Sequence, residues 1–168
     1  ANALFVCEPV SNLVHADVLK KTGGTFSASR AKEGEEFLTS TDSWFRPVNT
    51  TVGPDGGLYV VDFYRKLVEH PAWIARADEK GIYTHAGVLQ ESDFLEGSDR
   101  GRIYRIVRAD FDRRAFHSQP YLPEMRTRDL VFGLGHANRW LRTTAQRLLV
   151  ERQDSAAIPA LKLLLTEK

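Results

Sequence analysis

Short apolar runs separated by turn-forming residues occupy the first two thirds of the chain. Residues 4–7 are apolar, residues 12–19 carry large apolar side chains, and residues 25–30 alternate polar with small or aromatic ones. Gly23 and Gly24 interrupt the pattern between the second and third runs. Short strands separated by turn signals are typical of a β-meander, the unit of sandwiches, barrels and propeller blades. We therefore predict three short strands in this region.

A Gly-Pro-Asp-Gly-Gly sequence at residues 53–57 gives the strongest local prediction. Asp-Gly favours the positive backbone angles of a tight turn, and Pro54 fixes the direction in which the chain enters it. Residues 46–52 precede the turn, and the strand-prone sequence Leu-Tyr-Val-Val follows it at residues 58–61. The pattern predicts a β-hairpin. The alternation of charged and apolar residues over 101–107 predicts a further strand with one wet face.

A long excursion separates the hairpin from this last strand. Helical spacing over residues 64–73 predicts one or two helical turns. Connections of this length are uncommon in compact domains and are usually functional or mobile. We therefore expect an irregular, partly exposed segment after the helical turns.

Helical spacing replaces the strand pattern beyond residue 110. Three helices are predicted, over residues 128–134, 139–152 and 156–165. Asn138 suits the N-cap of the second helix, and Pro159 is tolerated in the first turn of the third. The predicted fold is therefore mixed, β followed by α. Its parts are a β domain over residues 1–109, a polar linker over 110–125 and a helical domain over 126–168.

Composition limits the kinds of chemistry that this chain carries. Its 168 residues have an ordinary apolar share and a formal charge of +1, so a packed core is expected. Cys7 is the single cysteine, which excludes an internal disulfide and a CxxCH haem motif. No apolar run approaches the roughly 20 residues of a membrane helix, and residues 1–9 do not read as a signal peptide. Either the chain is cytosolic or its N-terminus is missing, and we favour a missing N-terminus.

An arginine-rich stretch over residues 100–114 offers one charged surface. Such a stretch attracts nucleic acid or an acidic partner when it is exposed. It lacks the patterned aromatic residues of a platform that binds single strands. We therefore interpret it as a solvated strand face and expect no nucleic-acid partner.

Folding the hairpin about its turn brings polar residues to one rim. The rim residues expected are Arg46, Asn49, Asp62, Tyr64, Arg65, Glu69 and His70. An Arg46–Asp62 pair suits the orientation of a carbonyl or hydroxyl group, and His70 is a natural proton acceptor. Asp62 and His70 are thus the catalytic candidates, and Arg46, Asn49, Tyr64 and Arg65 the cofactor-binding ones. The alternative is structural, with Asp62 capping a turn and Arg46 simply pairing with it. No metal site is predicted.

Several of these segments resemble known families. Residues 45–48, 52–62 and 101–106 resemble a blade of the glucose/sorbosone dehydrogenase-type propeller. With residues 7–15 and 63–71, the chain is similar to membrane-bound dehydrogenases abundant in planctomycetes and verrucomicrobia. Residues 140–149 and 157–161 resemble a HEAT repeat. The resemblance implies about two propeller blades followed by HEAT-like hairpins, with the remaining blades and further helical repeats as partners.

The same resemblance implies an activity. It is the oxidation of a sugar or another alcohol by the complete protein, with pyrroloquinoline quinone and calcium or a haem as cofactors, in the periplasm or outside the cell. The rim would then face the central funnel of the propeller. However, the resemblance to quinone-dependent dehydrogenases leads us to expect a second arginine at the position of Val48 and a lysine within residues 7–15. Neither residue is present. The alternative is a non-catalytic module that binds glycan or protein partners.

Overall fold

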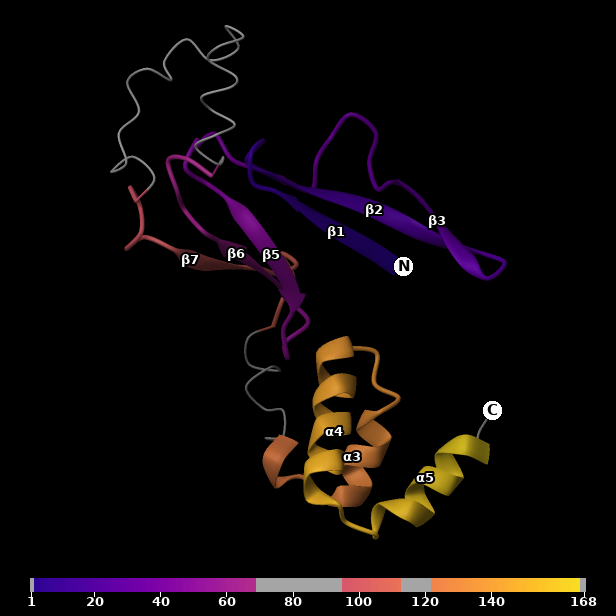
Figure 1. Ribbon diagram of the computed structural model, residues 1–168. Helices are drawn as coiled ribbons and strands as arrows, with labels where there is room; N and C mark the ends of the chain where they lie inside the picture. Colours follow the sequence, from indigo (N-terminus) through magenta and orange to yellow (C-terminus); the bar gives the residue numbers. More distant parts are fainter. Residues whose placement is uncertain (1, 69–94, 113–121, 167–168) are drawn as a thin grey trace, which may run out of the picture. The chain divides into compact units, whose positions relative to one another are not determined.

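The computed structural model describes residues 2–68, 95–112 and 122–166, and strands precede helices in it (Figure 1). The strands are β1 (Asn2–Glu8), β2 (Leu13–Thr22), β3 (Thr25–Arg30), β4 (Leu38–Thr39), β5 (Pro47–Val52), β6 (Leu58–Asp62) and β7 (Arg102–Ile106). The helices are the 3-10 helix η3 (Leu122–Glu124), α3 (Thr127–Gly133), α4 (Arg139–Arg152) and α5 (Ala157–Thr166). The predicted order of β followed by α is confirmed. Contacts divide the chain into two compact units, residues 1–51 with 59–104 and residues 52–58 with 105–168.

The first sheet is antiparallel, with strand order β1-β2-β3 and the short β4 paired to the start of β2. Successive strand residues face opposite sides, so β2 buries Val14 and Ala16 on one face and turns His15 to the other. The Phe5 ring packs edge-on against Phe37, with centroids 4.7 Å apart. The three strands predicted at the start of the chain are therefore confirmed.

The second sheet has the order β5-β6-β7, and its first two strands form the predicted hairpin. The Gly53 N–H donates to the Gly57 carbonyl at 2.9 Å, and Gly56 takes the positive φ of 77° that the turn requires. Leu58 and Val60 on β6 are buried, and the Phe45 ring packs edge-on against Tyr104. This sheet carries the candidate site at the end away from the turn.

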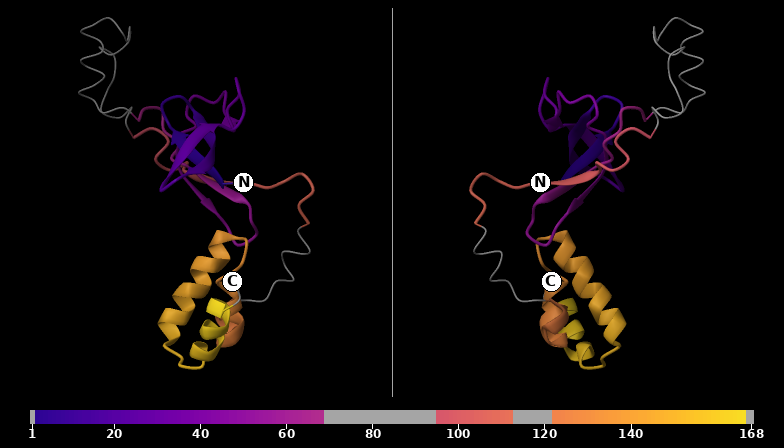
Figure 2. Two further views of the ribbon diagram at one scale, coloured as in Figure 1. Left: turned by 90° about the vertical axis from the view of Figure 1, so that its right-hand side faces the viewer. Right: turned by 90° about the vertical axis from the view of Figure 1, so that its left-hand side faces the viewer.

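The helical segment begins and ends where the sequence indicates. Asn138 caps α4, because its side-chain oxygen accepts from the Trp140 N–H at 2.8 Å. α3 packs against both α4 and α5 (Figure 2). One core cluster joins Leu130 to Ala145 and Leu148, and a second joins Val131 to the alanines of α5.

The described residues form two open sheets and three α-helices. These elements do not by themselves establish a closed propeller or a HEAT repeat. Every helix in these ranges is too short or too polar to span a membrane.

Candidate functional site

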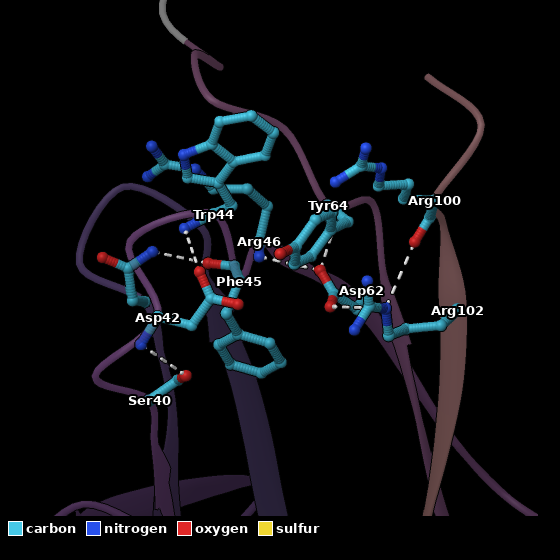
Figure 3. A network of polar contacts seen from close by, with 10 residues as sticks. Ser40, Asp42, Trp44, Phe45, Arg46, Asp62, Tyr64, Arg100 and Arg102 are labelled. Carbon is cyan, nitrogen blue, oxygen red and sulfur yellow. Dashed lines mark hydrogen bonds and ion pairs between the residues drawn. The ribbon is translucent and has the colours of Figure 1, made fainter. Parts of the chain in front are cut away.

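Asp62 lies at the centre of the polar network (Figure 3). The alternation of β6 places Leu58, Val60 and Asp62 on one buried face, so the carboxylate is covered although it ends the strand. Its Oδ1 accepts from the main-chain N–H groups of Arg46, at 2.9 Å, and Tyr64, at 2.8 Å. The carboxylate therefore caps the turn after β6, and it bonds to the main-chain N–H of Arg46 and not to its guanidinium.

The Arg46 side chain is directed elsewhere and is almost fully buried. Its Nε donates to the Arg65 carbonyl at 3.0 Å, and its Nη2 donates to the Lys66 carbonyl at 2.8 Å. Its Nη1 donates to the carbonyls of Pro9, at 2.9 Å, and Val10, at 3.3 Å. The guanidinium thus clamps the turn between β1 and β2 to the segment that follows β6.

Two aromatic rings and a guanidinium lie next to one another at the rim, with the Trp44 and Tyr64 rings tilted by 52°, and we call Trp44, Tyr64 and Arg102 the rim platform (Figure 3). The centroids of Trp44 and Tyr64 are 5.8 Å apart, and the Arg102 Cζ lies 3.9 Å from the Tyr64 centroid. Both rings are half-buried, and the Arg102 side chain is 41% exposed. The platform therefore presents aromatic surface and a cation to solvent.

Arg102 also connects the platform to the buried carboxylate. Its Nε donates to the Arg100 carbonyl at 3.2 Å and lies 4.0 Å from the Asp62 Oδ2. A hydrogen bond with Tyr104, followed by the charges of Tyr104, Tyr64 and Asp62, raises the pKa of the Arg102 guanidinium. Arg102 is therefore a permanent cation beside a carboxylate that is closed to solvent.

The backbone at Tyr64 is held in an unusual conformation. Its φ of 50° lies in the left-handed region, which is uncommon for a residue other than glycine. Gly97, with a φ of 87°, lies so close to the Tyr64 carbonyl that a Cβ at position 97 has no room. Strain of this kind clusters at functional sites, where the surrounding structure imposes it.

Two buried polar atoms at this rim have no hydrogen-bond partner among the described residues. They are the Oδ2 of Asp62 and the Nη1 of Arg65. The Arg65 guanidinium lies over the Phe63 ring, with its Cζ 4.4 Å from the centroid. Buried polar atoms are nearly always hydrogen-bonded, so these two atoms are exceptions within the described part of the chain.

The structure brings together four of the predicted site residues: Arg46, Asp62, Tyr64 and Arg65. Asn49 lies exposed on β5. His70 and Glu69 lie outside the described residues. Trp44 was not singled out by sequence reasoning, and Arg102 was interpreted only as a solvated strand residue. The adjacent Phe45-Arg46 motif and the charged-apolar alternation of β7 were the available signals.

A second polar cluster lies on the first sheet. His15 contacts Glu36 through Nδ1 at 2.6 Å and Asp17 through Nε2 at 3.0 Å. Arg30 pairs with the other oxygen of Glu36. The hydrogen bond that His15 donates to Glu36, together with the one to Asp17, raises the pKa of His15, and the bond to His15 lowers the pKa of Glu36. This cluster tethers the loop before β4 to β2.

A family model described as "Domain of unknown function (DUF7133)" matches residues 1–110. The matched range contains both sheets and every residue of the rim platform. No curated protein and no solved structure matches the chain.

Proposed function

The chain belongs to the DUF7133 family, and on that premise we propose that its rim is a recognition site for carbohydrate. The observation that carries the proposal is the rim platform with Asp62 beneath it. Aromatic rings offer apolar faces to the C–H surface of a sugar, and a few placed polar groups fix its orientation. Arg102 supplies hydrogen-bond donors at the surface, and its Nε lies 4.0 Å from the covered Asp62 Oδ2.

Binding of a panel of neutral and acidic oligosaccharides, measured by calorimetry, tests this proposal. Trp44→Leu removes one ring of the platform and is expected to weaken binding about fivefold, because an aromatic contact contributes on the order of 1 kcal/mol. Trp140→Leu is the matched control, because Trp140 lies at the start of α4. Undiminished affinity in Trp44→Leu, or an equal loss in the control, would overturn the proposal.

A second candidate is catalytic, namely the oxidation of a sugar or another alcohol by the complete protein. The observation that favours it is the Asp62 Oδ2, which is fully covered and has no hydrogen-bond donor among the described residues. In general-base catalysis, a carboxylate oxygen accepts the proton of an alcohol hydroxyl. His70, the other predicted proton acceptor, remains a prediction.

Arg46 does not fit the role of a ligand for the quinone that the resemblance implies. The guanidinium of Arg46 donates four hydrogen bonds to main-chain carbonyls, so it is not available to the carboxylates of pyrroloquinoline quinone. Within the described ranges, no group of three His, Cys, Asp or Glu side chains is placed to hold a metal such as calcium. We therefore assign no step to either cofactor.

Dye-linked oxidation of sugars by the complete protein, with the quinone and calcium supplied, separates the two candidates. Turnover that falls at least about a hundredfold in Asp62→Asn supports catalysis, because general-base catalysis contributes roughly that much or more. Sugar binding without turnover supports recognition alone.

The architecture implied by the resemblance is also proposed. The two sheets would be propeller blades, and the helices would begin a HEAT-like array, in a periplasmic or secreted protein. Exposed apolar side chains support further packing partners, with Val6 and Phe26 on the first sheet, Ile103 on the second, and Leu163 and Leu165 on α5. No nucleic-acid partner is proposed.

A further inference from the structure

A cavity lined mainly by apolar residues lies in the helical region. It has a volume of about 200 Å³, is partly open to solvent, and lies between α3, α4 and the 3-10 helix η3. Apolar residues form most of its wall, namely Leu122, Met125, Leu130, Gly133, Leu141 and Ala145. Asp129 and His136 complete the lining. The cavity shares no residue with the rim platform.

Small residues leave this space unfilled. Gly133 has no side chain, and a Cβ at that position would lie 3.1 Å from the Cβ of Ala145. α3 and α4 therefore approach each other closely at this point. The space beside the contact stays empty because neither residue carries a side chain long enough to fill it.

Hydrogen bonds hold the walls of the cavity in place. The Arg152 guanidinium donates to the carbonyls of Pro123 and Met125, both at 2.6 Å, in and next to η3. In the turn between α3 and α4, Arg142 donates to the His136 carbonyl at 2.7 Å. The cavity is therefore preformed, as binding sites for small molecules usually are.

The two polar side chains of the lining are already engaged within the chain. Both oxygens of the Asp129 carboxylate accept from the Arg126 guanidinium, at 2.8 and 3.3 Å. The His136 Nδ1 accepts from the Asn138 N–H at 2.9 Å. The lining, which lies wholly within the described residues, therefore favours an uncharged ligand, because burial of a charge against apolar walls is costly.

We propose that this cavity binds a small apolar molecule about the size of one aromatic ring. Apolar cavities of about 150 Å³ bind benzene, whereas pockets for larger ligands have volumes of roughly 300–1,000 Å³. Water in an apolar space has few hydrogen-bond partners, so its displacement by an apolar ring is favourable. The flexible Met125 side chain adapts to such a ring, and its sulfur makes favourable contacts with aromatic groups. The proposal is independent of carbohydrate recognition at the rim.

Titration of the complete chain with toluene, followed by NMR of the side-chain methyl signals, tests the proposal. Saturable shifts are expected for Met125, Leu130 and Leu141. Benzylamine has the same ring with a charged ammonium group, and it is expected to bind at least about tenfold more weakly because the ammonium group loses hydration in the cavity. Absence of saturable shifts with toluene, or equal affinity for the two compounds, would overturn the proposal.

Substitutions that fill the cavity localise the binding. Leu122→Phe and Ala145→Leu each add side-chain volume to the wall and are expected to weaken toluene binding at least about tenfold. Leu165→Phe is the matched control and is expected to leave the affinity unchanged, since Leu165 is 75% exposed on α5. Circular dichroism checks the fold of each variant, and Leu122→Phe carries the test if Ala145→Leu overpacks the core. Toluene affinity that is unchanged in the folded filling variants, or equally reduced in Leu165→Phe, contradicts binding in this cavity.

Discussion

Arginine clamps occur in both the sheet region and the helical region, and the comparison shows what is special about the rim. In the helical region, Arg142 donates to the carbonyls of His136, at 2.7 Å, and Ala137, at 2.8 Å. Arg152 donates to the carbonyls of Met125 and Pro123, both at 2.6 Å. Arg46 does the same in the sheet region with four bonds. A buried or half-buried arginine on main-chain carbonyls is therefore a structural device of this chain.

The two regions differ in whether their buried carboxylate and guanidinium atoms are all hydrogen-bonded. In the helical region, Thr127 donates to the Asp154 carboxylate at 2.6 Å, and the Ala156 N–H donates to its other oxygen at 2.9 Å. In the sheet region, Asp62 and Arg65 each keep a buried polar atom without a hydrogen-bond partner among the described residues, although Arg102 lies 4.0 Å from the Asp62 atom. Fully satisfied polar networks stabilise a fold, whereas a buried polar atom without a hydrogen bond costs free energy.

The largest expected effect on the free energy of unfolding comes from removing the Arg46 side chain. Arg46→Ala removes four hydrogen bonds from covered carbonyls and is expected to lower the free energy of unfolding by about 3 kcal/mol. Arg142→Ala removes two bonds near the surface and is expected to cost about 1 kcal/mol. Urea unfolding of the two variants measures the difference. Equal losses of unfolding free energy in the two variants would contradict the structural role of Arg46 and would favour the earlier prediction that it binds a ligand.

A smaller effect is expected at the start of α4. Asn138→Ala removes the side-chain oxygen that caps the Trp140 N–H and is expected to cost about 1 kcal/mol. Asn138→Asp retains that acceptor but loses the amide donor to the carbonyls of Gly53, at 2.9 Å, and Pro54, at 3.0 Å, so it is expected to lose stability as well. Thermal unfolding followed by circular dichroism measures both variants, and an Asn138→Ala variant as stable as the parent protein would contradict the capping role.

The smallest effects are pH dependences of opposite sign in the two regions. The pKa of His15 is raised by its hydrogen bonds to Glu36 and Asp17, above an unfolded value of about 6.5. Its stabilisation is therefore complete below that value and is lost as pH rises through the folded pKa. His15→Gln is expected to remove this loss from the pH profile of urea unfolding. A slope that persists in the variant would assign it to another group.

Asp154 in the helical region behaves in the opposite way. The hydrogen bond from Thr127, with that from the Ala156 N–H, lowers the pKa of Asp154 below an unfolded value of about 3.9. Its stabilisation is present above that value and is lost as pH falls through the folded pKa. Thr127→Val is expected to weaken the acid dependence. Carboxylate NMR titration that shows an unchanged Asp154 pKa in this variant would contradict the assigned cause.

The sequence by itself determined the elements, because their signals are local. The turn at residues 53–57 carries its own positive-φ glycine, and Asn138 caps the helix that begins at the next residue. Apolar spacing then placed the second and third predicted helices to within about one residue, within the usual ambiguity of helix ends. The hairpin pattern also predicted that Asp62 and Tyr64 lie at the rim, because the two antiparallel strands begin and end at the same edge of the sheet.

Only the tertiary structure decided what the rim side chains do. The Arg46 guanidinium meets a carbonyl 37 residues earlier in the chain, and no local pattern encodes that contact. The rim platform of Trp44, Tyr64 and Arg102 likewise joins three separate segments. The physical reason is that side-chain hydrogen bonds and ring contacts depend on the packing of distant segments, whereas turns and caps depend on neighbouring residues. The clamp and the rim platform therefore emerge only in the folded chain.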